Sequence, residues 1–454
     1  MQAQASASRG VAARPGLAFR AGVAPRRTAC RAQQRDSSQP QEPGFLQKCA
    51  TIALAAATTA LPLTLSPVLA PTPPAHALLT AGDPIKNASA ILRYALPINN
   101  KPIRQIQREL ELIAEALRIP GSKSLGPVAK AVRTSQGILT KQRAVIEADF
   151  APDKKARRAA PRRGRPPPPA RPRRAQRRAP TRARAAPRRA AQAAGEAALA
   201  KLDGALAEFQ AIVDAKDKQA VPLKQREALE YVGTIEEAMV KGFPFEVPKE
   251  YASRPLLKGR ATLEMKVAAS ETPEGPAELT LKLVLDGYNA PVSAGQFMDL
   301  VQRRFYDGME IQRADGFVVQ TGDPDGPADG YVDPATNEIR RVPMEIKVVG
   351  DKEPLYEVNL EDLGRFNETP VLPFNAYGTL AWARAEFDNN SASSQVFFLL
   401  KESELTPSGA NLLDGRYAVF GYAVQGQDGL GLLKVGDKIK YIKVLDGAEN
   451  LVNA

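Results

Sequence analysis

The side chains most often used in catalysis are distributed very unevenly along this chain of 454 residues. Its only cysteines are Cys30 and Cys49 and its only histidine is His76, so all three lie within the first 77 residues. If that stretch is removed, the remainder has no disulfide, no thiol chemistry, no Cys or His nucleophile and no ordinary zinc site. We therefore expect neither metal nor cofactor. Any chemistry must use carboxylates, hydroxyls, amides, Lys, Arg or aromatic side chains.

Residues 1–77 have the composition of a two-part targeting segment. Residues 1–35 are rich in Arg, Ala and Ser and contain no acid, which is typical of an organellar transit peptide. An apolar run from Ala50 to Ala70 follows, and then an A-x-A cleavage signal that ends at Ala77. The combination resembles the presequence of thylakoid-lumen proteins. It predicts cleavage after Ala77 and a mature chain in the chloroplast thylakoid lumen.

The alternative is that the run from Ala50 to Ala70 remains as a membrane anchor, since its length is near the ~20 residues that a span requires. Its two prolines and its Ala and Thr content make it weakly apolar, which favours cleavage. We therefore expect no stable membrane span after processing.

The excess positive charge of the chain is confined to two segments. The formal net charge is +12, but residues 1–77 contribute +6, and residues 157–189 hold 14 Arg and no acid. Without both segments the remainder carries a net charge of −8. The folded body is therefore acidic, and we expect no nucleic acid as a partner.

The Arg-, Pro- and Ala-rich stretch over 157–193 interrupts an otherwise helical sequence. Its prolines break helices, its like charges repel and it has no apolar period, so we predict a disordered insert. Two alternatives remain: a basic arm for nucleic acid or anionic lipid, or a translated intron or frameshift in the gene. The arm lacks aromatic residues that could stack on bases, which counts against nucleic acid.

Residues 78–245 are predicted to form a helical bundle. Apolar residues recur there at spacings of three and four with charged residues between them, as expected of amphipathic helices. Such stripes can cover one another in a bundle, although one of them could instead serve a partner helix in a coiled coil. The stripes comprise Ile103, Ile106, Leu110, Ile113 and Leu117, then Leu202, Leu206, Phe209 and Val213, then Leu229, Val232, Ile235 and Met239.

Residues 250–454 have the period of strands rather than helices. Apolar residues alternate from Ala261 to Val267 and from Leu279 to Leu285, which predicts a hairpin with one buried face. Ser293 and Gln296 have the spacing of a capping box, so we expect a helix to begin there. Further short strands are expected at 316–320, 378–384, 395–400 and 417–424. The whole chain is thus predicted to be an α+β protein in which a helical domain precedes a closed β-barrel.

Five motifs follow one another in this second region. They are NAPVSAGQF at 289–297, FYDG at 305–308, GFVVQTGD at 316–323, NNSASSQVFF at 389–398 and LDGRYAVFG at 413–421. In order and spacing they resemble the cyclophilin family, from about residue 260 to residue 447. The resemblance implies a cyclophilin-like barrel and peptidyl-prolyl cis-trans isomerase activity without metal or cofactor. The preceding helices and the presequence are similar to those of multidomain thylakoid-lumen cyclophilins associated with photosystem II assembly.

The family's functional positions can be transferred onto this sequence. Arg313 stands where a cyclophilin places its catalytic Arg, one residue nearer to the following Phe. The resemblance implies that Phe317 lines the substrate pocket, that Gln320 binds the substrate backbone and that Ala383 lies on the strand that aligns the peptide. The resemblance also implies that Phe397 and Leu413 form walls of the proline pocket. Three positions depart from the family: Val318 replaces the usual Met, Leu412 the usual Trp and Tyr417 the usual His.

The proposed reaction needs few groups. Rotation about a peptide bond has a barrier of ~18–20 kcal/mol, and exchange at proline takes tens of seconds or more without a catalyst. An apolar pocket can hold the ring while a guanidinium donates to the prolyl nitrogen, where the lone pair localises as the bond twists. Loss of such a donor costs ~2.7–4 kcal/mol, and one trimmed apolar wall roughly 1–3 kcal/mol. With Arg313 kept and the walls altered, we expect slowed rather than abolished catalysis.

Two functions are compatible with these residues. The first is a peptidyl-prolyl isomerase and folding chaperone whose partners are proline-containing segments of lumenal or thylakoid membrane proteins, including photosystem II subunits. The second is a non-catalytic peptide-binding scaffold or assembly factor. Arg313, Phe317 and Gln320 favour the first, and the altered walls favour the second. A third function, nucleic-acid binding, depends only on the Arg-rich stretch.

Overall fold

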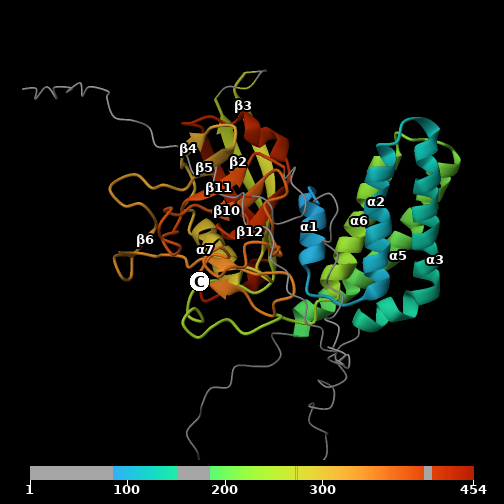
Figure 1. Cartoon of the computed structure of the whole chain (residues 1–454), viewed down its shortest axis with the longest axis horizontal. Coiled ribbons are helices and arrows are strands. Elements are labelled where there is room, and N and C mark those ends of the chain that lie inside the picture. The colour runs from blue at the N-terminus through green and yellow to red at the C-terminus, as the bar shows by residue number, and fades with distance from the viewer. Residues whose placement is uncertain (1–84, 151–184, 271, 273–274, 403–411) are drawn as a thin grey trace, which may run out of the picture. The chain divides into compact units, whose positions relative to one another are not determined.

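The computed structural model describes residues 85–150, 185–270, 272, 275–402 and 412–454 (Figure 1). The predicted targeting segment, including the run from Ala50 to Ala70 and the cleavage signal, lies outside these residues. Within them, no helix combines the length and the apolar character needed to cross a membrane.

The first part of the described chain is helical. It comprises α1 (Ala88–Ala95), α2 (Lys101–Leu117), a 3₁₀ turn (Gly121–Ser124), α3 (Leu125–Phe150), α5 (Ala185–Asp214) and α6 (Val221–Ala238). The side chain of Asn100 caps α2 by accepting the Ile103 N–H at 3.1 Å. Helices α2, α3, α5 and α6 form a four-helix bundle in which α2 packs on α3 and α6, and α5 packs on α3 and α6.

The apolar stripes read from the sequence form the core of this bundle. On α2 the side chains of Ile103, Ile106, Leu110 and Ile113 are fully buried, and Leu117 is partly buried. The stripe from Leu202 to Val213 on α5 and the stripe on α6 join them in one hydrophobic cluster. The bundle interpretation is therefore confirmed, and these stripes serve core packing rather than an external coiled coil.

The expectation that residues 157–193 lack structure is wrong for the end of that stretch. Helix α5 begins at Ala185, so 185–193 is helical. Pro187 is tolerated there because the first turn of a helix has backbone N–H groups without intrahelical acceptors, and the Ala-rich sequence that follows is a strong helix former. Residues 157–184 lie outside the described part of the chain.

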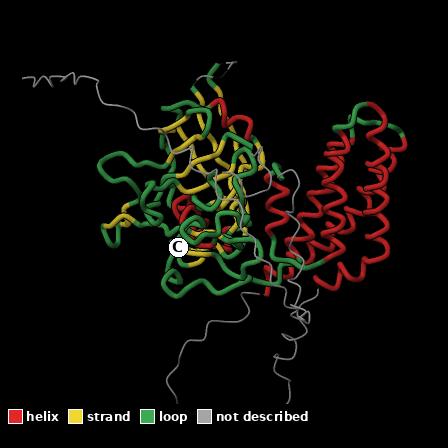
Figure 2. Tube along the Cα trace, viewed as in Figure 1, coloured by secondary structure: helices red, strands yellow, loops and turns green. Residues whose placement is uncertain are grey.

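The second part is built on an eight-stranded antiparallel sheet, drawn as yellow strands in Figure 2. The strand order is β13-β2-β3-β12-β10-β11-β5-β4. The bounds are β2 (Arg260–Ala269), β3 (Ala277–Asp286), β4 (Ile311–Ala314), β5 (Val318–Thr321), β10 (Thr379–Trp382), β11 (Val396–Leu399), β12 (Val419–Gln425) and β13 (Lys438–Asp446). Three short pairs lie outside it: β1 (Leu256–Leu257) with β14 (Leu451–Val452), β6 (Val332–Asp333) with β7 (Glu338–Ile339), and β8 (Glu345–Ile346) with β9 (Leu355–Tyr356). Two 3₁₀ turns, at Gln427–Leu432 and Ala448–Asn450, complete this part.

The predicted hairpin is β2 and β3. Its residues alternate between buried and half-buried along β2, and Leu263 faces Leu283 across the pair while Met265 faces Leu281. The four further strands predicted from the sequence are present as β5, β10, β11 and β12, each shifted by one or two residues at its ends.

The two ends of the sheet meet and close it. Glu310, next to β4, forms a bridge with Lys438 at the start of β13. The Ile311 N–H donates to the Asp437 carbonyl and the Ile439 N–H to the Met309 carbonyl, both at 2.8 Å. Because these bonds join β4 to β13, the curled sheet closes as the predicted barrel, which leaves no long unpaired edge.

Helix α7 (Pro291–Gln302) begins earlier than the sequence indicated, so the capping box at Ser293 and Gln296 is wrong. The N-terminal N–H groups of α7 are instead satisfied by a distant carboxylate: Glu345 on β8 accepts Val292 N–H at 3.2 Å and Ser293 N–H at 2.7 Å. Burial raises the pKa of Glu345 to about 7, although these bonds oppose the shift. A partner 52 residues away is invisible to a local sequence pattern.

Candidate functional site

A groove with a volume of about 440 Å³ lies on the barrel. All but one of the residues predicted from the sequence line it: Arg313, Phe317, Val318, Gln320, Ala383, Phe397, Leu413 and Tyr417. They come from β4, β5 and β11, from the turn between β4 and β5, and from the loops that follow β10 and precede β12. The barrel therefore brings together side chains that are spread over more than 100 residues of sequence.

Strand register fixes the middle of the groove. Gln320 on β5 faces Arg313 on one neighbouring strand and Phe397 on the other. Directly opposed residues of antiparallel strands have Cβ atoms about 4.5–5.5 Å apart, so the three side chains start from adjacent positions. The Gln320 Nε2 donates to Gln395 Oε1 at 2.9 Å, and this amide pair forms a polar section between the guanidinium and the aromatic wall.

The apolar wall is made of stacked aromatic rings. Phe397 lies parallel to Phe374 with ring centroids 5.9 Å apart, and perpendicular to Tyr417 at 5.6 Å. Phe397 is almost fully buried, whereas Phe317 remains 43% exposed. One ring is thus held by packing and the other is accessible, an arrangement that suits a pocket open to a ring-shaped apolar group.

Arg384 supports the Tyr417 side of this wall. Its guanidinium carbon lies 4.9 Å from the Tyr417 ring centroid. Its Nε donates to the Arg416 carbonyl at 2.9 Å, and its Nη1 donates to the carbonyls of Ala385 at 2.8 Å and Glu386 at 2.9 Å. These bonds hold the guanidinium over the ring, where a cation–π contact stabilises it.

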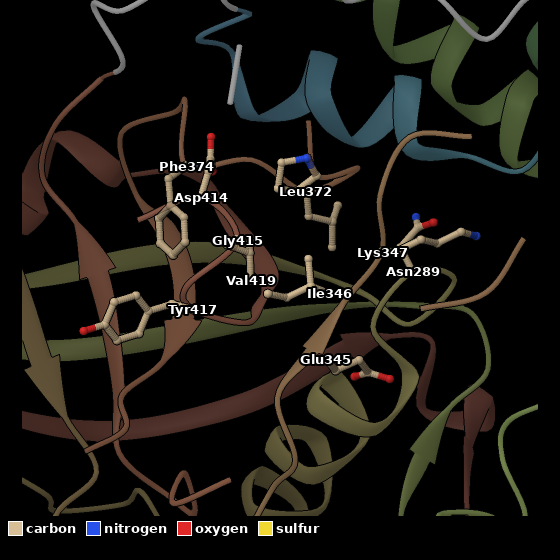
Figure 3. Close-up of a pocket in the computed structure, with 11 residues that line it drawn as sticks. Asn289, Glu345, Ile346, Lys347, Leu372, Phe374, Asp414, Gly415, Tyr417 and Val419 are labelled. Atoms are coloured by element: carbon tan, nitrogen blue, oxygen red, sulfur yellow. The ribbon is translucent and has the colours of Figure 1, made fainter. Parts of the chain in front are cut away.

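A second, much smaller cavity of about 10 Å³ lies behind Tyr417. This volume is at the lower limit for one water molecule. Figure 3 shows Asp414 next to Phe374, with the Tyr417 ring pointing away from Glu345 and Lys347. The Asp414 Oδ1 accepts the Phe374 N–H at 2.7 Å, and burial raises the pKa of Asp414 to about 7. Asp414 therefore fixes Phe374, the ring on which Phe397 stacks. The residues around the small cavity thus support the wall of the groove and do not form a second binding site.

Arg313 does not stand alone in the groove. Its Nε lies 2.7 Å and its Nη2 2.5 Å from Asp315 Oδ2. The other oxygen, Oδ1, accepts the backbone N–H groups of Phe317 and Val318, both at 2.9 Å. The two backbone bonds and the guanidinium lower the pKa of Asp315 to about 2. The carboxylate is therefore ionised at any physiological pH, and both of its oxygens have hydrogen-bond donors.

Leu412 is the predicted residue that the structure does not place in the groove. Its side chain is 77% exposed, while its neighbour Leu413 lines the cavity. Val318 lines the groove but is only 4% exposed, so little of its side chain is accessible there. Two of the three positions that depart from the family therefore contribute little accessible wall.

Several lining residues were not singled out from the sequence. Gln395 lies within the motif at 389–398, and that motif could have identified it as a groove residue. Arg341 follows the β7 strand, donates to the Ser391 carbonyl at 2.6 Å and pairs with Asp329 at 3.2 Å. Arg341, Asp329 and Arg384 lie in loops outside the quoted motifs or at their edges, so nothing in their local pattern connected them to the groove.

Comparison with known proteins first defines the class. Residues 271–445 match the model of cyclophilin type peptidyl-prolyl cis-trans isomerases, so the barrel is a cyclophilin-type domain. A crystal structure of a cyclophilin type peptidyl-prolyl cis-trans isomerase from Cryptosporidium parvum covers 41% of this chain and 98% of its own, with 18% identity and a TM-score of 0.27.

The helical domain then narrows the class to one family. Residues 87–161 and 179–240 match the PsbQ-like domain of CYP38-like peptidyl-prolyl cis-trans isomerases. The chloroplastic peptidyl-prolyl cis-trans isomerase CYP38 of Arabidopsis thaliana is 48% identical over 87% of this chain and 82% of its own length. A Synechocystis protein described as a thylakoid lumen peptidyl-prolyl cis-trans isomerase is 41% identical over 83% of this chain and 86% of its own. The chain belongs to the CYP38-like family of cyclophilin-type peptidyl-prolyl cis-trans isomerases.

These relatives also bear on the predicted location. One is named as chloroplastic and the other as a protein of the thylakoid lumen. Both agree with the two-part presequence, and the location in the chloroplast thylakoid lumen is confirmed.

Proposed function

We propose that this protein catalyses cis-trans isomerisation of prolyl bonds in segments of lumenal or thylakoid membrane proteins. The observation that carries the proposal is the groove itself, in which the Arg313 guanidinium, the Gln320 amide and an aromatic wall converge. Membership of a family of peptidyl-prolyl isomerases supports it.

Each lining residue receives a role from its position. The Arg313 guanidinium donates to the prolyl nitrogen as the bond twists, and its interaction strengthens as the lone pair localises. Phe397, Leu413 and the accessible face of Phe317 hold the proline ring. Gln320 binds the substrate backbone, while Ala383, whose N–H donates to the Gln395 carbonyl, offers its own carbonyl to an extended peptide. Tyr417, fixed by Arg384, closes the far wall.

The finer proposal concerns the clients. We propose that the clients of this chain are subunits of photosystem II and that its role is to assist their assembly or repair. The resemblance of the two-domain architecture to cyclophilins linked to that process supports this proposal. The groove itself requires only that a client segment be extended and contain proline.

The test is a proline-isomerisation assay on residues 78–454, the predicted mature chain. Removing a preorganised donor should lower kcat/KM of Arg313→Ala by about 10²–10³-fold. The matched control is Arg143→Ala, which removes an equally charged, half-exposed guanidinium from the helical domain. Equal rates in all three proteins, at the level of the uncatalysed reaction, would contradict the proposal.

A second function is favoured by a specific observation. Arg313 is bonded to Asp315, and Leu412 lies outside the groove, so the protein could bind proline-containing segments without isomerising them. A peptide titration followed by NMR separates the two functions. Binding that Phe397→Leu weakens, without any catalysed exchange between cis and trans signals, would identify a peptide-binding scaffold.

A further inference from the structure

The environment of Arg313 differs from that of the other arginines that line the groove. Arg384 donates to three backbone carbonyls and stacks on Tyr417. Arg341 donates to the Ser391 carbonyl and pairs more loosely with Asp329. Arg313 alone among these three places two of its nitrogens on a single carboxylate oxygen, Asp315 Oδ2.

The Asp315 carboxylate is held independently of this pair. Its Oδ1 accepts the N–H groups of Phe317 and Val318, which fixes the carboxyl group at the turn between β4 and β5. An ordinary surface ion pair is weakened because two flexible side chains must be ordered. Here one partner is already immobile, so the pair forms with a smaller loss of side-chain entropy. The geometry therefore favours a paired Arg313 in the free protein.

Pairing has a direct chemical consequence for catalysis. A donor accelerates proline isomerisation only insofar as it interacts more strongly with the twisted bond than with the planar one. A guanidinium that already donates Nε and Nη2 to a carboxylate has fewer N–H groups to offer, and its charge is partly neutralised. Both effects reduce the stabilisation available to the prolyl nitrogen.

We propose that Asp315 is a restraining positioning residue, which orders the Phe317 rim of the groove and at the same time holds Arg313 in a less active, charge-paired state. This inference rests on the proposed isomerase function. It predicts slow catalysis, because a carboxylate outside the groove pairs with an arginine that lines it.

The test is Asp315→Asn in the chain of residues 78–454. Asn keeps an oxygen that can accept the Phe317 and Val318 N–H groups and removes the negative charge. Because half-exposed pairs are worth about 0.2–1 kcal/mol, kcat/KM for a proline-containing tetrapeptide should rise about 1.4- to fivefold, chiefly through kcat. The matched control is Glu310→Gln, which removes the same charge from the exposed Glu310–Lys438 pair of the same barrel. It should leave the rate unchanged.

Two further measurements separate this role from a merely structural one. Sodium chloride screens half-exposed pairs, so salt should raise the rate of the unmodified chain and leave Asp315→Asn unaffected. In the Arg313→Ala background, Asp315→Asn should give no increase, because the carboxylate acts through Arg313. If Asp315→Asn does not fold, as judged by circular dichroism, Asp315→Ser and the salt dependence of the unmodified chain carry the test.

The outcomes distinguish the two proposals. Activity that depends on Arg313 but does not rise in folded Asp315→Asn would overturn the role of Asp315 and leave the isomerase function intact. An inactive unmodified chain with an active Asp315→Asn variant would support the role of Asp315. No activity in either protein would overturn both.

Discussion

The two domains each contain an arginine–carboxylate pair, and the two pairs stand in opposite surroundings. In the helical domain Arg104 Nη1 lies 3.2 Å from Glu236 Oε1, and the Glu236 side chain has no exposed surface. In the barrel Arg313 and Asp315 are 53% and 39% exposed. Burial raises the pKa of Glu236 to about 8, while backbone donors and Arg313 lower that of Asp315 to about 2. The same two charges therefore affect folding in one domain and, as we propose, catalysis in the other.

The buried pair is part of a network that joins helices. Arg104 on α2 also donates to the carbonyls of Arg93 at 2.7 Å and Leu96 at 2.9 Å, and to Gln107 Oε1 at 2.9 Å. Loss of one member of such a network leaves the others desolvated without a partner. The exposed pair has water to replace either member, so its loss should change stability very little.

The largest effect should follow from breaking the buried pair. Arg104→Ala leaves Glu236 without its cation, and the free energy of unfolding should fall by about 3–5 kcal/mol near pH 8. The loss should be smaller at about pH 5, where Glu236 is protonated and carries no charge. Urea unfolding at both pH values measures this. A loss equal to that of Arg143→Ala, which breaks an exposed pair with Glu147, would contradict the comparison.

The second effect is a pH dependence of stability. Burial raises the pKa of Glu236 from 4.5 to about 8, opposed by Arg104 and Arg93. The folded state binds this proton more tightly than the unfolded state, so stability is greatest below about pH 4.5 and declines as the pH rises to about 8. The slope is at most about 1.4 kcal/mol per pH unit. Unfolding of Glu236→Gln across this range should be flatter; an unchanged slope would show that Glu236 is ionised when folded.

Arg384 should have an effect between those of Arg104 and Arg313. It is half-buried, and within the described residues it pairs with no carboxylate. Arg384→Ala removes the contact with the Tyr417 ring and three bonds to carbonyls. We expect a loss of about 0.5–1 kcal/mol, because at least one face of the guanidinium is already desolvated by the ring. Thermal unfolding measures it. If Arg384→Lys behaves like the unmodified chain, stacking of the planar group contributes nothing.

The smallest effect should come from the exposed pair. Arg313→Ala and Asp315→Asn should each change the free energy of unfolding by less than about 0.5 kcal/mol, as expected of surface positions. Urea unfolding of both variants checks this in parallel with the isomerase assay. A loss above 2 kcal/mol in Arg313→Ala would mean that the pair is a stability element like that of Arg104, and the contrast between the domains would fail.

Much of the fold could be predicted from local patterns. The stripes on α2, α5 and α6 and the alternation along β2 and β3 each report one buried face, and the structure confirms them. The predicted groove residues were located by ordered motifs, and all except Leu412 line one cavity. The start of α7 and the helical end of the Arg-rich stretch were missed. The start of α7 depends on Glu345, which is distant in sequence. The helical end of the Arg-rich stretch contains a proline, which a helix tolerates only in its first turn.

Local sequence patterns did not predict the two charge pairs. Arg313 and Asp315 are two residues apart, a spacing that places side chains on one face of a strand, yet nothing in the sequence indicated that the carboxylate would be fixed by backbone donors and held against the guanidinium. Arg104 and Glu236 are 132 residues apart and meet only because α2 packs on α6.

The sequence by itself determined the family, the two-domain order and most of the groove, because periodicity and motif spacing are properties of the chain read along its length. The tertiary structure alone decided which charges are buried, which are paired and which remain available to a substrate. These properties depend on the solvent and partners that surround a side chain, and folding brings those together from distant parts of the chain.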